Sequence, residues 1–232
     1  MTSQANLVLG ILELDEGLMP DSPVNVQGEG ALQNPETFNV PIITELVEGA
    51  WADIVIRGDP SLKGPCVAAA RRLVARGANV ISADCGFFIR HQAAVSGAVN
   101  VPVAMSSLLL IPTLLRQLSP AQKLAVITAD SRHCSEDLFG IENPADRARV
   151  VVGGIEGGKY VSDALSRPLV LTSIDQIEQE VCACVAQLRA RYPEIGMLLF
   201  ECTGFPCVTN TLRRRTGLPI YDITDLCRLT LA

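Results

Sequence analysis

The sequence predicts an α/β fold of two similar lobes, each with a short, mostly parallel sheet flanked by helices and with a cleft between them. Short apolar runs alternate with segments of helical periodicity along all 232 residues, as they do in α/β proteins. The apolar runs are almost continuously hydrophobic, which is typical of parallel strands covered on both faces. We therefore predict buried strands at residues 7–14, 54–57, 80–83, 101–105, 124–128, 150–152, 197–200 and 218–221.

The helices between these strands are predicted from their caps and from the spacing of their apolar residues. One helix ends at Gly77, since glycine is common just past a helix end. Another carries an apolar stripe that starts at Ile177 and follows Ser173 and Gln176, which are spaced as a capping box. A third helix is expected over residues 108–118.

The chain also repeats its own architecture. Cys202 follows Cys85 by 117 residues, and Pro219 follows Pro102 by the same distance. Each cysteine comes directly after an apolar strand and an acidic residue, and a Gly-Phe pair follows within three residues. The pattern predicts two lobes, each with a cysteine at the carboxyl end of a central strand.

These two cysteines are the candidate reactive residues. Open α/β sheets bind ligands at the carboxyl ends of their strands, so two facing lobes would enclose a cleft with one thiol on each wall. The N–H groups at the start of a following helix hold anions and lower the pKa of a thiol. A single cysteine in this position is more often a small buried residue, but the equivalent placement of Cys85 and Cys202 favours a function.

Composition and charge exclude several other classes of protein. The formal net charge is −6, no long segment is rich in Lys and Arg, and the run Arg213–Arg215 is interpreted as a solvated helix end, so a nucleic-acid partner is not expected. The longest apolar stretch, residues 101–115, is interrupted by polar residues and is shorter than the roughly 20 residues of a membrane span. Residues 1–6 lack a secretion signal, which favours a cytoplasmic protein.

The eight cysteines predict neither a disulfide scaffold nor a metal site. Their density is low for a disulfide-rich protein, and nothing in the sequence indicates an oxidising compartment. No CxxC pair is present, and only His91 and His133 could join cysteines in a zinc site. We therefore predict no metal ligand, and we expect the other six cysteines to be ordinary small apolar residues.

Three segments resemble the aspartate/glutamate racemase superfamily of cofactor-independent enzymes. They are Ala-Asp-Cys-Gly-Phe-Phe at 83–88, Val-Pro-Val-Ala-Met-Ser-Ser at 101–107 and Glu-Cys-Thr-Gly-Phe-Pro at 201–206. The superfamily includes glutamate, aspartate and hydantoin racemases, maleate isomerase and arylmalonate decarboxylase. The resemblance implies that no cofactor is used, that the protein is a homodimer or higher homo-oligomer, and that the final helix returns to the first lobe.

The lobes expected on this basis are residues 1–105 with 223–232, which carry Cys85, and residues 106–222, which carry Cys202. The implied chemistry is proton transfer at the carbon next to the carboxylate of a small acid. One thiolate would remove the proton and the opposite thiol would return one on the other face. Backbone N–H groups and hydroxyls would hold the enolate-like intermediate and the carboxylate. The residues expected to bind the substrate are Gly86, Phe87, Ser106, Ser107, Thr203 and Gly204.

Several details distinguish this chain from the better-known racemases of the superfamily. No histidine adjoins Cys202, and the first loop, residues 13–20, is acidic. An acidic loop disfavours a second carboxylate on the substrate unless a residue such as Arg57 offsets its charge. Ser106 and Ser107 are as well placed to cap the following helix as to contact a substrate.

The main prediction is an isomerase, a racemase of a small α-substituted carboxylic acid with Cys85 and Cys202 as the acid/base pair. One alternative is a lyase, a decarboxylase or a cis–trans isomerase that uses the same fold and an enolate-like intermediate. A second alternative is a non-catalytic protein that binds a small acid, with both cysteines inert in the core.

Overall fold

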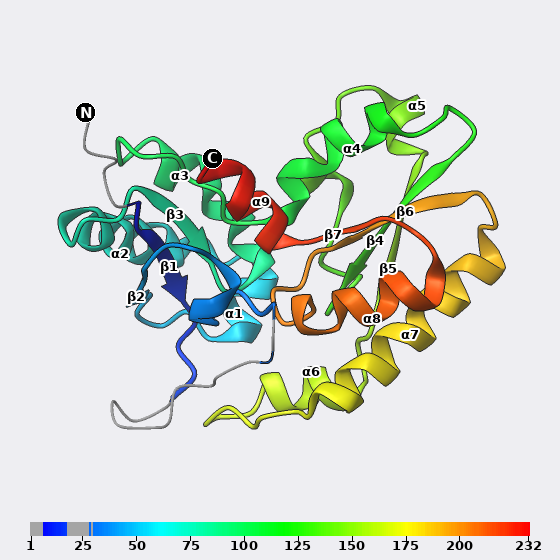
Figure 1. The fold of residues 1–232 in the computed structure, drawn as a ribbon. Coiled ribbons are helices and arrows are strands. Elements are labelled where there is room, and N and C mark those ends of the chain that lie inside the picture. Colours follow the sequence, from blue (N-terminus) through cyan, green and yellow to red (C-terminus); the bar gives the residue numbers. More distant parts are fainter. Residues whose placement is uncertain (1–6, 18–27, 29) are drawn as a thin grey trace.

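Two parallel sheets organise the chain in the computed structural model, which describes residues 7–17, 28 and 30–232 (Figure 1). The first sheet has the order β2-β1-β3, and its strands are β1 Leu9–Glu13, β2 Ile42–Leu46 and β3 Val80–Ala83. The second has the order β5-β4-β6-β7, and its strands are β4 Lys123–Thr128, β5 Val150–Gly154, β6 Ile195–Phe200 and β7 Ile220–Tyr221. All of these strand pairs are parallel. The predicted α/β fold with two mostly parallel sheets is confirmed.

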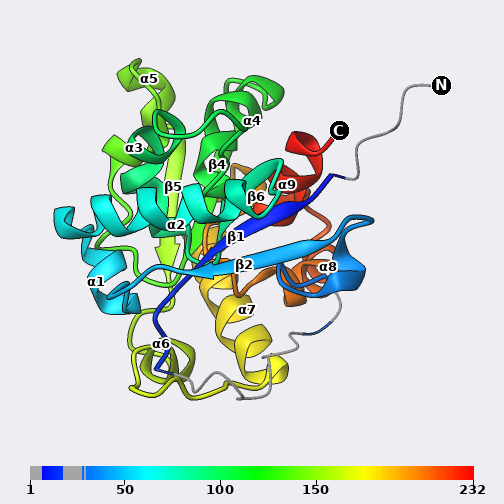
Figure 2. The ribbon, with the colours of Figure 1, turned by 90° about the vertical axis from the view of Figure 1, so that its left-hand side faces the viewer.

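Helices flank both sheets (Figure 2). Those that follow strands of the first sheet are α1 Ala52–Arg57, α2 Lys63–Ala75, the short helix η3 Gly86–His91 and α3 Gln92–Ser96. The other α-helices are α4 Ile111–Gln117, α5 Pro144–Arg147, α6 Lys159–Ala164, α7 Ile174–Arg191, α8 Pro206–Thr216 and α9 Ile223–Thr230, and the other short helices are η1 Pro35–Thr37, η2 Pro60–Leu62, η4 Ser107–Leu110 and η5 Glu136–Phe139. Residues 1–6, on which the expectation about a secretion signal rests, and residues 18–20 of the acidic loop lie outside the described part. Among the described helices, none is both long and apolar enough to cross a membrane.

Two of the predicted strands are wrong. Residues 54–57 belong to α1, which ends because Gly58 adopts the left-handed conformation and donates its N–H to the carbonyls of Ile54 and Val55. Residues 101–105 form only a single parallel bridge, between Val103 and Ile81, since Pro102 has no N–H to extend the ladder. The prediction also missed β2, an edge strand with no fully buried residue, because it lacks a continuous apolar pattern.

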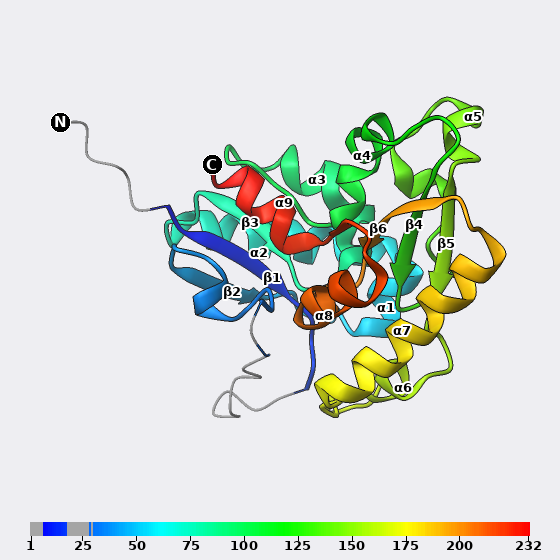
Figure 3. The ribbon, with the colours of Figure 1, turned by 45° about the vertical axis from the view of Figure 1, so that its right-hand side comes forward.

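The core explains why the other strands are visible in the sequence. β1 and β4 are the central strands of their sheets, and nearly all their residues are buried. Ser173 caps α7 by accepting a hydrogen bond from the Gln176 N–H at 3.3 Å, although the Gln176 side chain bonds Glu180 instead of closing a capping box. α7 packs against β4 and β5 (Figure 3). Burial on both faces therefore produces the near-continuous hydrophobicity.

The final helix, α9, leaves the second sheet and lies beside the first (Figure 3). The Arg228 guanidinium lies 5.6 Å from the centroid of the Phe38 ring and donates a hydrogen bond to the Thr37 carbonyl at 3.3 Å. Ile223 and Cys227 are fully buried in the same hydrophobic cluster as the strands of the first sheet. The last segment therefore ties residues that follow β7 to the lobe that begins the chain.

Candidate active site

Cys85 lies at the carboxyl end of β3, where the extended strand turns into η3. Its side chain is half-buried. Burial raises the pKa of this thiol well above its ordinary value, and the charges of Glu201, Cys202 and Asp84 raise it further. The Phe87 N–H acts in the opposite direction by hydrogen bonding to the sulfur. The N–H of Phe87, a residue predicted to bind the substrate, therefore points to the Cys85 thiol.

Cys202 occupies the equivalent place at the carboxyl end of β6 in the second sheet. Burial raises the pKa of its thiol to about 12, and the charge of Glu201 adds to this effect. Hydrogen bonds from the Tyr160 hydroxyl and the Gly204 N–H lower it. Because the charge of Cys202 also raises the pKa of Cys85, the fold brings the two thiols within electrostatic reach of each other.

The loops that carry the two cysteines touch directly. The Thr203 hydroxyl donates a short hydrogen bond to the Asp84 carbonyl oxygen. At Gly86, an added Cβ would lie 2.2 Å from Oε1 of Glu201 and 2.4 Å from its backbone oxygen, so only glycine fits. Thr203 and Gly86 were both predicted site residues, and the structure places them at the junction of the lobes.

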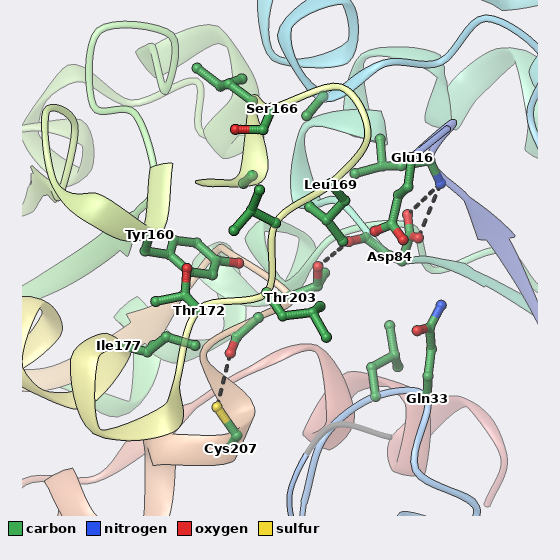
Figure 4. A pocket seen from close by; sticks show the side chains of 18 of the residues that line it. Glu16, Gln33, Asp84, Tyr160, Ser166, Leu169, Thr172, Ile177, Thr203 and Cys207 are labelled. Atoms are coloured by element: carbon green, nitrogen blue, oxygen red, sulfur yellow. Dashed lines mark hydrogen bonds between the residues drawn. The ribbon is translucent and has the colours of Figure 1, made fainter. Parts of the chain in front are cut away.

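A cavity of about 300 Å³ opens beside this junction and is lined from both lobes (Figure 4). Figure 4 shows Glu16 and Asp84 on one side of it and Tyr160 on the other, with Thr203 between them. Gly204 also lines the cavity, whereas neither Cys85 nor Cys202 does. Each half-buried cysteine is next in the chain to a residue that lines the cavity: Cys85 follows Asp84, and Cys202 precedes Thr203.

Tyr160, which the sequence analysis missed, connects the cavity with the second thiol. Its hydroxyl lies 3.3 Å from Sγ of Cys202, and its ring packs against Phe205 with centroids 5.7 Å apart. A Cβ on Gly204 would lie 2.0 Å from the Tyr160 oxygen, so this glycine makes room for the contact. Tyr160 comes from α6, and no signal in the sequence linked that helix to Cys202.

Replacement of Tyr160 by phenylalanine is expected to slow the alkylation of Cys202. The hydroxyl lowers the pKa of this thiol, so its loss raises the pKa and reduces the thiolate fraction. A hydrogen bond of about 1 kcal/mol corresponds to a roughly fivefold slower reaction with iodoacetamide at pH 8. Peptide mass spectrometry measures the rate at each cysteine, with Tyr192→Phe as the control; an unchanged Cys202 rate would contradict the role of Tyr160.

Other predicted residues lie away from the cavity. Ser106 caps η4 by accepting a hydrogen bond from the Leu108 N–H at 3.3 Å, and Ser107 donates one to the Phe200 carbonyl at 2.7 Å. Both serines are fully buried, as is the Phe87 side chain, and none of the three lines the cavity. Their role in substrate binding stays a prediction.

The cavity is acidic, in line with the acidic loop noted in the sequence. The acidic residues that line it in the described part of the chain are Asp15, Glu16, Asp53 and Asp84. Burial and the charge of Glu13 raise the pKa of Glu16 to about 7. Arg57 does not line the cavity and pairs with Asp53 at 3.1 Å.

Arg167 and Trp51 form an aromatic and cationic edge of the cavity that the sequence analysis did not find. Arg167 is the one cation among the described residues that line it. Its guanidinium stacks 4.4 Å from the centroid of the Trp51 ring and donates a 2.6 Å hydrogen bond to Asp53. The segment after α6 thereby reaches across from the second lobe to α1 of the first.

Solved structures that match nearly the whole chain identify its fold. An arylmalonate decarboxylase variant in a sulfate-associated form matches 96% of this chain and 93% of its own with a TM-score of 0.59 and 19% identity. Glutamate racemase from Aquifex pyrophilus matches 97% of this chain and 82% of its own, with a TM-score of 0.57 and 16% identity. The chain has the Asp/Glu racemase superfamily fold. The predicted resemblance to this superfamily is confirmed at the level of the fold.

The curated proteins with similar sequences are named for an activity other than racemisation. A dimethylsulfoniopropionate lyase of Durusdinium sp. clade D is 29% identical over 201 residues, which are 83% of this chain and 66% of that protein. Dimethylsulfoniopropionate lyase 7 of Emiliania huxleyi is 26% identical over 235 residues, 97% of this chain and 66% of its own length. The chain thus spans slightly less than two thirds of these relatives. No protein-family profile matches it.

These relatives correct the main functional prediction. The expectation of an isomerase is wrong, because the curated relatives are named lyases, the reaction class that stood among the alternatives. This chain shares its fold with racemases and with a decarboxylase, and the two-cysteine pattern in the sequence indicates the fold without indicating what leaves the substrate.

Proposed function

We propose that this protein is a carbon–sulfur lyase that cleaves a small carboxylate with a sulfonium group at its β-carbon, such as dimethylsulfoniopropionate. The observation that carries the proposal is the similarity to curated dimethylsulfoniopropionate lyases over 83–97% of the chain. The site is chemically suited to this substrate, since thiols lie beside a cavity lined by acidic and aromatic side chains.

The proposed reaction starts with the removal of the α-proton of the substrate by the thiolate of Cys85 or Cys202. The electron pair of the broken C–H bond forms the double bond, and the C–S bond breaks with its pair retained by sulfur. The products are neutral dimethyl sulfide and acrylate, and the proton on the thiol returns to solvent. N–H groups at the cysteine loops would stabilise the negative charge that develops on the carboxylate.

The acidic lining favours a cationic leaving group. Glu16, ionised above its pKa of about 7, contributes negative charge to one side of the cavity, whereas burial raises the pKa of the neighbouring Asp84 well above its ordinary value. The aromatic side chains of Trp51 and Tyr160 also line the cavity. Aromatic faces and carboxylates both attract an onium ion. Among the described lining residues, Arg167 is the cation that could pair with the carboxylate of such a zwitterion, in competition with its ion pair to Asp53. A substrate with two carboxylates would meet repulsion in the same cavity.

The test is incubation of the purified protein with dimethylsulfoniopropionate in deuterated water. We expect dimethyl sulfide and acrylate in equal amounts, measured by gas chromatography and by proton NMR. Deuterium at the α-carbon of recovered substrate without either product would contradict the lyase proposal. Ligand-induced stabilisation with no exchange and no product would favour the non-catalytic alternative.

Glu16 is expected to make the apparent affinity for the sulfonium substrate depend on pH. Because the pKa of its carboxyl is raised to about 7, it is ionised above that pH and neutral below. The KM should therefore rise as the pH falls through about 7, whereas Glu16→Gln should show the high KM throughout. We expect a change of about three- to tenfold, from steady-state kinetics between pH 5.5 and 8.5. Glu142→Gln, on the exposed surface, is the control; a wild-type pH dependence in Glu16→Gln would contradict this role.

A further inference from the structure

Glu201 is a buried carboxyl at the junction of the two cysteine loops, and the proposed reaction does not use it. It directly precedes Cys202 at the end of β6 and is only 1% exposed. Its Oε2 accepts a 2.7 Å hydrogen bond from the Thr128 hydroxyl on β4. Its Oε1 has no hydrogen-bond partner among the described residues. This oxygen faces Gly86, where an added Cβ would lie 2.2 Å away.

We propose that Glu201 is a positioning residue that controls the ionisation of both thiols, so that a thiolate forms readily only while Glu201 is protonated. The inference rests on the proposed function for the identity of the reactive pair. Its physical basis is that one buried carboxyl lies at the junction of the two cysteine loops, next to Cys202 in the chain and against Gly86, the residue after Cys85. A thiolate on either loop would place a second negative charge near an ionised Glu201.

The charge of Glu201 raises the pKa of three thiols near it, and Arg90 opposes this effect at Cys134. Glu201 raises the pKa of Cys85, on the loop after β3, and of Cys202, at the end of its own strand. It also raises the pKa of Cys134, which follows β4. Asp84, whose own pKa burial raises well above its ordinary value, acts in the same direction on Cys85 when it is ionised. Burial raises the pKa of Glu201 to about 7, so its charge changes in the neutral range.

These groups titrate as a coupled set. A thiolate beside a neutral Glu201 carries the same total charge as a thiol beside an ionised Glu201. Exchange between these two states breaks one S–H bond and forms one O–H bond, while the electron pair of the S–H bond stays on sulfur. The unpartnered Oε1 is available for that proton. A second buried charge is thereby avoided.

The test is the pH dependence of iodoacetamide alkylation at each cysteine, followed by peptide mass spectrometry. In Glu201→Gln, the midpoints for Cys85 and Cys202 should fall by about one pH unit or more, which is about tenfold faster alkylation at pH 8. Cys66 and Cys227 are internal controls, because burial is the main cause of their raised pKa values and Glu201 does not contribute. An unchanged or higher midpoint in a folded variant would overturn the proposal.

Thr128→Val provides a second variant that keeps the carboxyl. The Thr128 hydrogen bond lowers the pKa of Glu201, so its removal should keep Glu201 neutral to a higher pH. Alkylation of both site cysteines should then be faster near pH 7.5, with the difference disappearing in strong alkali. If Glu201→Gln fails to fold, as fast alkylation of Cys66 would reveal, unchanged rates in Thr128→Val overturn the proposal.

A matched control and an activity assay separate the two proposals. Glu156→Gln removes another half-buried acid of the second lobe, one that hydrogen bonds to Ser131, and should leave both midpoints unchanged. A shifted midpoint in Glu201→Gln without any release of dimethyl sulfide by the wild-type protein would contradict the proposed lyase function alone. A normal release of dimethyl sulfide with unshifted midpoints would contradict the role of Glu201 alone.

Discussion

Replacement of Cys85 or of Cys202 by serine is expected to reduce the release of dimethyl sulfide by about 10²- to 10⁴-fold, the range typical of a positioned acid or base. A serine hydroxyl keeps the size of the side chain but is far more difficult to ionise than a thiol. Both thiols already have raised pKa values because of burial, so the site does not tolerate a weaker acid. The measurement is kcat/KM for dimethyl sulfide formation.

The control for this prediction is Cys182→Ser, because Cys182 is a half-buried residue of α7 that does not line the cavity. It should keep full activity. Deuterium exchange at the α-carbon distinguishes the two thiols: the variant that lacks the base should lose exchange and elimination together. Near-normal turnover by either Cys85→Ser or Cys202→Ser would show that this thiol takes no part in the reaction.

The location of the cysteine loops was predictable because it follows from local pattern and topology. Each cysteine ends a continuous apolar run, and in a parallel sheet the carboxyl ends of neighbouring strands share one edge. The repeat at 117 residues then predicted that both lobes present the same edge. β6 is an interior strand of its sheet, as predicted, whereas β3 is an edge strand that pairs with β1, so the prediction that Cys85 follows a central strand is wrong.

The cavity was not predictable in the same way, because its lining depends on tertiary contacts. Tyr160 comes from α6, Trp51 precedes α1, and Arg167 lies in the segment that joins α6 to α7. None of these residues has a neighbour in the sequence that marks it as part of the site. They meet because the second lobe reaches over the first, where Arg167 stacks on Trp51.

The reaction class was unpredictable for a related chemical reason. Racemisation and elimination both begin with removal of a proton next to a carboxylate, and a pair of cysteines serves either reaction. They differ in the group attached to the next carbon, which the cavity lining must recognise. The acidic loop that includes Glu16 was visible in the sequence, but only the structure shows that Glu16 lies beside Asp84 on one side of the cavity, opposite Tyr160.

Gly86→Ala is expected to have the second largest effect, on stability as well as on activity. The new Cβ would lie 2.2 Å from Oε1 of Glu201 and 2.4 Å from its backbone oxygen. The carboxylate could rotate, but the backbone oxygen cannot move without shifting the end of β6. We expect a loss of about 1–3 kcal/mol in the free energy of unfolding, as for other overpacked sites.

The same displacement should separate the two cysteine loops and reduce kcat more than it raises KM, because the substrate cavity is mostly lined by other residues. Denaturant unfolding and steady-state kinetics measure the two effects. Gly64→Ala is the matched control, since a Cβ there meets no atom within 4 Å and alanine favours the helix α2. Equal stability and activity of the two alanine variants would mean that the lobes do not need this close approach, which would remove the physical basis for coupling the thiols through Glu201.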